Sequence, residues 1–209
     1  MKKLLIAALA LGTAGVAQAH EVWIERGANG AAQIWLGEPE RPIPPGGDPA
    51  FPSLKAPKLV PVSTAAQTRG PGYIEVVVPA GDVRAWDDDV FKPWDEDGKR
   101  AGVVYYARAG RSEAKAVMPL ELAPVAANGD RFVLTRDGKP VAKTEVTLVS
   151  PSRWTLMLET DDKGEVALPA LAEKGRYILK ASVKEEGDFT LPAGKVAILH
   201  RTATTSFVN

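Results

Sequence analysis

The chain has 209 residues, and its 26 Lys and Arg side chains balance 26 Asp and Glu, so the formal net charge at pH 7 is zero. This balance argues against a nucleic-acid or anionic-membrane partner, because both attract strongly basic surfaces. The chain has no cysteine, which excludes disulfides, thiolate metal sites and a cysteine nucleophile.

The first residues have the pattern of a secretory signal. Lys2-Lys3 precedes an apolar run over 4–16, and Ala17-Gln18-Ala19 supplies the small residues of a cleavage site. We therefore predict a signal peptide over 1–19, a mature chain that begins with His20, and export to a periplasm. The apolar run is too short to cross a bilayer, and no later stretch approaches the roughly 20 apolar residues needed. We expect a protein that is not inserted in the membrane.

Short runs of alternating apolar and polar residues follow, separated by Gly, Pro and Asp clusters, and this pattern predicts antiparallel strands. In the first part the expected strands cover residues 20–24, 33–36, 73–78, 83–86 and 102–109. In the second part they cover residues 120–125, 131–135, 140–149, 153–159, 165–168, 175–183 and 196–208. Asp137-Gly138 predicts a hairpin turn, and residues 160–164 predict a plain turn.

The pattern becomes more regular after Met118-Pro119. We therefore predict two regions, an N-terminal β domain over 20–118 and a C-terminal β-sandwich domain over 119–209. The expected fold class is all-β, built from antiparallel β-sandwich domains, with the C-terminal one immunoglobulin-like or prealbumin-like.

Two segments are predicted to be loops. Residues 37–57 are rich in proline, which removes ladder donors, so no regular element is expected there. A loop this long is either functional or a mobile surface excursion, and the second interpretation is favoured. Residues 87–98 are acidic and are expected to form a solvated loop with Phe91 and Trp94 packed beneath it.

The acidic loop does not fit a calcium site. In an EF-hand register, Pro93 would take the first ligand position and Val104 the position of the bidentate glutamate. Neither side chain can hold the ion. Asp87, Asp88 or Asp89 could still supply an oxygen ligand to another metal, as could Glu21.

His20 is the first candidate ligand. After cleavage, its α-amino group and its imidazole would offer two nitrogens of one residue to a metal ion. The pKa of an α-amino group is about 7.7–8, so a divalent metal can displace its proton near neutral pH. This pair of nitrogens suits Cu(II) and Ni(II). The alternative is a leader that ends before a histidine by chance.

His200, in the last predicted strand, is the second candidate and the only other histidine of the chain. If the fold brings the two ends together, His20 and His200 would supply three nitrogens to one metal. The alternative is a half-buried histidine that is hydrogen-bonded to a neighbouring strand. No catalytic motif was found, neither a nucleophile elbow, nor a zinc-protease helix, nor a nucleotide-binding loop.

The residues His20-Glu21-Val22-Trp23-Ile24-Glu25 resemble the opening of the DUF4198 family, exported bacterial proteins commonly described as periplasmic components of nickel or cobalt uptake. Similar segments follow at 120–125, 129–130, 137–141, 160–164, 175–177 and 200–207. The resemblance implies an all-β periplasmic protein connected with transition-metal handling, with His20 at a ligand position. At the position of His200, such proteins often carry a variable residue.

Taken together, these patterns predict a non-enzymatic periplasmic protein that binds a transition metal (Cu, Ni or Co) through His20 and His200. Its role would be capture, or delivery to a component of a metal-uptake transporter. The alternative is a structural or adhesive β-sandwich module that binds a protein or a glycan in the cell envelope. A copper oxidative enzyme that uses the same nitrogens is a third and weaker alternative.

Overall fold

A computed structural model describes residues 20–27 and 29–209, so the predicted signal peptide lies outside the described residues. This part of the chain consists of strands and loops with one short 3-10 helix, η2 (Phe51–Ser53). The predicted all-β sandwich fold is confirmed. In the described part, no helix has the length and apolar character needed to span a bilayer.

The amino-terminal sheet has the strand order β1-β2-β5-β4, and all of its neighbours are antiparallel. Its strands are β1 (Glu21–Arg26), β2 (Ala32–Gly37), β4 (Gln67–Arg69) and β5 (Tyr73–Val76). Side chains alternate between the two faces of a strand. In β1, Val22 and Ile24 enter one apolar cluster and Trp23 enters another, because both faces of this strand are covered.

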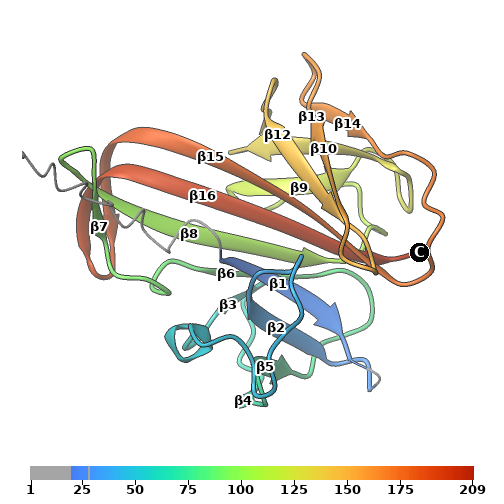
Figure 1. Ribbon diagram of the computed structural model, residues 1–209, viewed down its shortest axis with the longest axis horizontal. Helices are drawn as coiled ribbons and strands as arrows, with labels where there is room; N and C mark the ends of the chain where they lie inside the picture. Colours follow the sequence, from blue (N-terminus) through green and yellow to red (C-terminus); the bar gives the residue numbers. More distant parts are fainter. Residues whose placement is uncertain (1–19, 28) are drawn as a thin grey trace, which may run out of the picture.

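The central sheet has the order β13-β12-β15-β16-β8-β6-β3, with β7 paired to β8. Its strands are β3 (Lys58–Val60), β6 (Val83–Asp87), β7 (Trp94–Glu96), β8 (Lys99–Ala109), β12 (Glu145–Val149), β13 (Thr155–Glu159), β15 (Arg176–Leu191) and β16 (Gly194–Val208). Figure 1 shows the three long strands β8, β15 and β16 side by side through the middle of the molecule. The β8–β16 pair is parallel and sets His200 beside Val103.

The third sheet is built around β10 (Arg131–Arg136), which pairs with three antiparallel neighbours. These are β9 (Leu120–Pro124), β11 (Lys139–Pro140) and β14 (Glu165–Ala167). The predicted hairpin turn joins β10 and β11, with positive φ angles of 49° at Asp137 and 75° at Gly138. Both residue types tolerate these angles, which is why this dipeptide marks the turn.

Two apolar cores lie on opposite faces of the central sheet. On β8, Val103 and Tyr105 point into the core shared with β1, β2 and β5. Val104 and Tyr106 point into the core shared with β9, β10 and β12. Because one strand serves both cores, the predicted regions 20–118 and 119–209 are joined by a continuous sheet.

The proline-rich loop over 37–57 is largely irregular, as expected, and its second part is anchored in the core, while residues 41–46 are mostly exposed. Phe51 and Leu54 are buried in the core beneath the amino-terminal sheet. The Arg69 side chain donates hydrogen bonds to the carbonyl oxygens of both residues, at 3.1 and 2.6 Å. These contacts attach the second part of the loop to the sheet, a feature that the sequence did not predict.

The acidic segment over 87–98 also contains more structure than predicted. Its second half forms β7, which pairs with the start of β8 through a turn at Asp97-Gly98. Both turn residues have positive φ, 53° and 73°. The expectation that Phe91 and Trp94 pack beneath this segment is confirmed, because both contact the amino-terminal core.

A buried ion cluster connects the central sheet to β9. Glu121 is 1 % exposed, and its Oε1 accepts hydrogen bonds from Arg84 Nε and Arg108 Nη1, both at 2.7 Å. Its Oε2 accepts from the main-chain nitrogens of Val117 and Met118, at 2.8 and 3.0 Å. Every carboxylate oxygen is therefore satisfied, as a buried charge requires.

Candidate functional site

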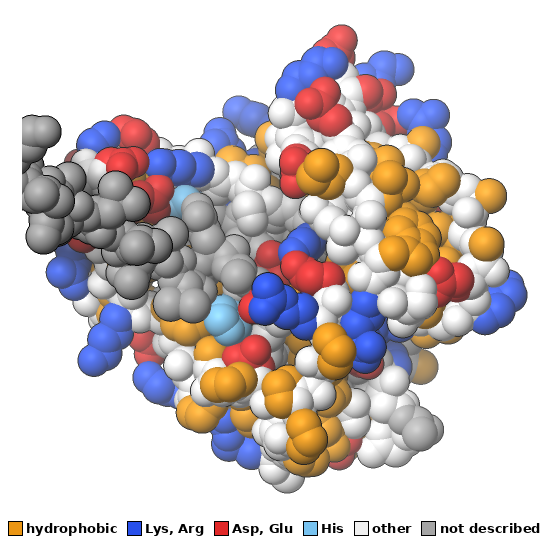
Figure 2. Space-filling model, viewed as in Figure 1, with side chains coloured by type: hydrophobic (Ala, Val, Ile, Leu, Met, Phe, Trp, Pro, Cys, Tyr) orange, Lys and Arg blue, Asp and Glu red, His pale blue; other side chains and the backbone are white. Residues whose placement is uncertain are grey.

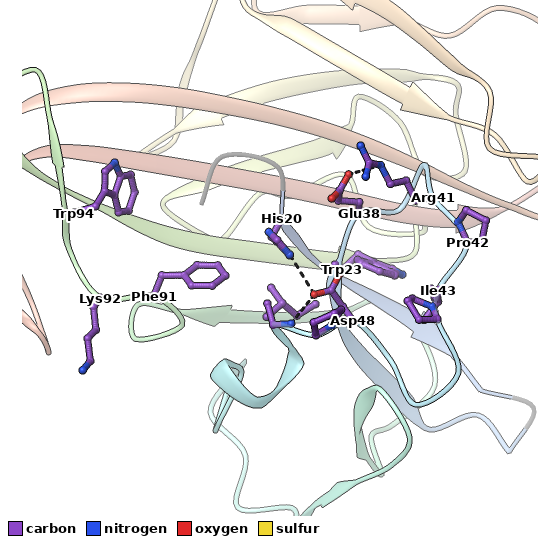
Figure 3. Close-up of a pocket in the computed structure, with 15 residues that line it drawn as sticks. His20, Trp23, Glu38, Arg41, Pro42, Ile43, Asp48, Phe91, Lys92 and Trp94 are labelled. Carbon is purple, nitrogen blue, oxygen red and sulfur yellow. Dashed lines mark hydrogen bonds and ion pairs between the residues drawn. The ribbon is translucent and has the colours of Figure 1, made fainter. Parts of the chain in front are cut away.

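His20 lies immediately before β1, in a cavity of about 780 Å³. Three segments form this cavity, namely the start of β1, the loop after β2 and the segment between β6 and β7. Figure 3 shows His20 between two apolar walls, with Phe91 and Trp94 on one side and Pro42 and Ile43 on the other. The cavity is therefore mostly apolar and has an imidazole near its middle.

The imidazole of His20 contacts the side chains of Asp48 and Phe91. Its Nε2 lies 3.2 Å from Asp48 Oδ1, and its ring meets the Phe91 ring edge-on at a centroid distance of 5.8 Å. Both side chains are largely shielded, with exposures of 13 % for His20 and 15 % for Asp48. A histidine that chelates a metal together with its own main-chain nitrogen uses Nδ1, whereas the Asp48 contact is made by Nε2.

Local chain geometry fixes the position of Asp48. Its Oδ1 also accepts a hydrogen bond from the Ala50 main-chain nitrogen at 2.7 Å, an Asx turn. The preceding Gly47 crosses Gly72 so closely that a Cβ on Gly47 would lie 2.2 Å from the Gly72 Cα. Only glycine permits this approach. The loop is thus attached to the turn before β5, and the carboxylate stays beside His20.

His200 is buried within β16 and belongs to a second pair of imidazole and carboxylate. Its Nε2 lies 2.7 Å from Glu96 Oε2 on β7, and its ring stacks on Trp94 at a centroid distance of 5.6 Å. Lys184 on β15 contacts the other oxygen of Glu96 at 2.8 Å. The Lys184 ammonium and the His200 ring together lower the pKa of Glu96 to about 2.

His20 and His200 therefore contact different carboxylates, Asp48 and Glu96. Each imidazole also contacts one aromatic ring of the segment over 91–94. Phe91 contacts His20 and Trp94 contacts His200, and both aromatic rings line the same cavity. Both imidazoles are visible on the face shown in Figure 2, at two separate places. Whether they share a metal ion stays a prediction.

Asp87, Asp88 and Asp89, which were predicted as possible oxygen ligands, do not line the cavity around His20. Asp88 binds Lys58 at 2.8 Å, and Asp89 lies 3.8 Å from Lys55. Asp87 accepts a hydrogen bond from the Asp89 main-chain nitrogen. Across residues 20–27 and 29–209, no three His, Asp or Glu side chains form a group that could hold a metal ion.

Glu21 is buried behind His20 rather than pointing into the cavity. Its Oε1 lies 3.8 Å from Lys180 Nζ, which also contacts Glu40 at 2.8 Å. Its Oε2 and the Tyr105 hydroxyl are buried and make no hydrogen bond within the described residues. Burial raises the pKa of Glu21 to about 8, against the opposing effect of the Lys180 charge.

Sequence reasoning identified both histidines but neither carboxylate that contacts them. Asp48 follows Gly46-Gly47 and precedes Pro49, a pattern that predicts an Asx turn but does not show which other side chain the carboxylate contacts. Glu96 belongs to the acidic segment that was predicted to be a solvated loop. Comparison with family models, with curated proteins and with solved structures finds no match to this chain.

Proposed function

We propose that the protein binds a divalent transition metal, Cu(II) or Ni(II), through the α-amino nitrogen and Nδ1 of His20 once the leader has been removed. The observation that carries this proposal is the contact of His20 Nε2 with Asp48 Oδ1 at 3.2 Å, at the edge of a preformed cavity. A carboxylate on the second ring nitrogen is the usual partner of a metal-binding histidine, because it fixes the ring and makes it a stronger donor.

The chemistry of the two nitrogens supports a tetragonal metal. Cu(II) and Ni(II) prefer nitrogen donors in a square arrangement, and a terminal histidine supplies two that are already linked covalently. In the proposal, His200 supplies a third nitrogen. Its Nε2 is engaged by Glu96, so Nδ1 would be its donor atom.

The biological role proposed is capture of the metal in the periplasm, or its delivery to an uptake transporter. The resemblance of residues 20–25 to exported proteins of nickel and cobalt uptake supports this role. The absence of a recognisable nucleophile or nucleotide-binding motif in the sequence is the reason for proposing a binding protein and not an enzyme.

Acetylation of the α-amino group of His20 is expected to weaken Cu(II) binding at least about a hundredfold, because the amine becomes an amide that no longer closes the chelate with the imidazole. Isothermal calorimetry on protein that begins at His20, with its amino terminus free or acetylated, measures this. The His200→Ala variant tests the third nitrogen separately. Equal affinity of the two amino-terminal forms would rule out His20 as a chelating terminus.

The Asp48→Asn variant is expected to bind Cu(II) about 10–100-fold more weakly, since the amide keeps the Asx turn but removes the charge beside the imidazole. Asp89→Asn is the matched control, because this half-exposed carboxylate lies outside the cavity lining. Copper titration monitored by electron paramagnetic resonance measures both variants. If the two variants bind equally well, Asp48 does not orient the ligand.

A second function is favoured by the aromatic and proline-rich walls of the cavity, which suit a protein or glycan partner. In that case the protein is a structural or adhesive envelope module. A partner captured by the wild-type protein would then be retained by the double variant His20→Ala/His200→Ala, in metal-free buffer.

A further inference from the structure

The cavity around His20 is far larger than a metal ion requires. A coordinated water takes about 30 Å³, whereas the cavity measures about 780 Å³. Volumes between roughly 300 and 1,000 Å³ are typical of sites for small organic molecules, which also have mostly apolar walls and a few polar groups. Here the walls include Pro42, Ile43, Phe91 and Trp94, and the polar groups are led by the His20–Asp48 pair.

The proposed ligands also leave room in the coordination sphere of the metal. His20 supplies two nitrogens and His200 at most a third, while tetragonal Cu(II) takes four or more donors. Asp48 contacts Nε2, on the far side of the ring from the chelating Nδ1, so its carboxylate orients the ring and is not itself a donor. At least one further donor is therefore needed, which either water or a molecule bound in the cavity can supply.

We infer that this donor belongs to a small organic chelator with a flat apolar body, and that the protein binds the metal as a ternary complex with it. The inference rests on the proposed function. A nitrogen and a carboxylate of the chelator would complete the coordination, and its ring would lie between Trp94 and Ile43, the two walls on either side of His20 (Figure 3). Burial of that ring adds affinity that neither the metal nor the chelator has alone.

The test compares Cu(II)–picolinate with Cu(II)–glycinate. Each chelator supplies one nitrogen and one carboxylate oxygen, and only picolinate carries an aromatic ring. Calorimetry on protein that begins at His20 is expected to show about tenfold tighter binding of the picolinate complex, for the apolar area that its ring buries. Electron paramagnetic resonance with ¹⁵N-labelled picolinate should show its nitrogen on the protein-bound copper.

The preference for picolinate should fall to about one in Ile43→Ala and in Trp94→Ala, which remove opposite walls of the cavity. In Ile43→Ala, binding of the glycinate complex should stay within about twofold. Ile43→Ala is the cleaner variant because Trp94 also stacks on His200. Met157→Ala, at a residue that is 70 % exposed and outside the cavity lining, is the control and should keep the full preference.

Equal affinity of the wild-type protein for the two complexes would overturn the ternary site and leave the metal site in place. Binding of picolinate without copper, at the same affinity, would overturn it as well, because the chelator would then not depend on the metal. Failure of copper to bind in any form would overturn both this inference and the proposed function.

Discussion

Replacing Glu121 by alanine is expected to lower the free energy of unfolding by about 3–5 kcal/mol, because it leaves two buried guanidinium groups without their shared carboxylate. Arg108 is fully buried and Arg84 nearly so, so water cannot replace the lost oxygens. The two main-chain donors at Val117 and Met118 lose their acceptor as well. Urea unfolding followed by tryptophan fluorescence measures the change.

The matched control is Glu113→Gln. This carboxylate also contacts Arg84, at 2.9 Å, but its side chain is 55 % exposed. We expect a loss below about 1 kcal/mol, because solvent screens an exposed pair. The Glu121→Gln variant keeps the shape and one acceptor oxygen and should lie between the two. Equal losses at Glu113 and Glu121 would show that burial does not determine the strength of this cluster.

The ion cluster could not be predicted from the sequence. Arg84, Arg108 and Glu121 lie in three different segments, and each occupies a position in a strand where a charged residue normally faces solvent. These positions are buried because the third sheet covers that face of the central sheet. Single-sequence periodicity reports alternation along one strand but carries no information about which sheet lies above it.

The strands themselves were largely predictable, because alternation of apolar and polar residues follows directly from the pleat. The strands that were missed, β3, β4 and β7, have three residues each, which is too short for alternation to stand out. The parallel pairing of β8 with β16 was also out of reach. It joins residues about a hundred positions apart in the chain, and sequence patterning contains no signal for such a pairing.

The candidate site was predictable only in part. A histidine placed directly after a cleavage pattern offers an amine and an imidazole to a metal whatever the fold is, so His20 could be identified from the sequence. Asp48 and Glu96 are part of the site only because the fold brings them to the histidines. Asp48 is 28 residues from His20 in the chain, and Glu96 is 104 residues from His200. Carboxylates are frequent in turns, so neither could be selected without the structure.

Stability of the metal-free protein is expected to fall as the pH rises from about 4.5 to about 8, through the buried carboxyl of Glu21. Burial raises the pKa of Glu21 from 4.5 to about 8, so the folded protein holds a proton that the unfolded chain has released. Folding then binds a proton across this interval, and a state that binds a proton loses stability as the pH rises. The loss is complete above pH 8.

The Glu21→Gln variant should remove this slope, because glutamine resembles the protonated acid at every pH. We expect the variant and the wild type to unfold at similar urea concentrations at pH 4.5, and the variant to be more stable by about 2–4 kcal/mol at pH 9. This range is below the full value of the pKa shift because local relaxation and water penetration stabilise a buried charge. Glu40→Gln, at the more exposed partner of Lys180, is the control.

In protein that begins at His20, the neighbouring ammonium should reduce the slope, since a positive charge favours the ionised carboxyl. If the two proteins keep the same difference in stability from pH 4.5 to 9, Glu21 does not titrate in this interval and the prediction is wrong.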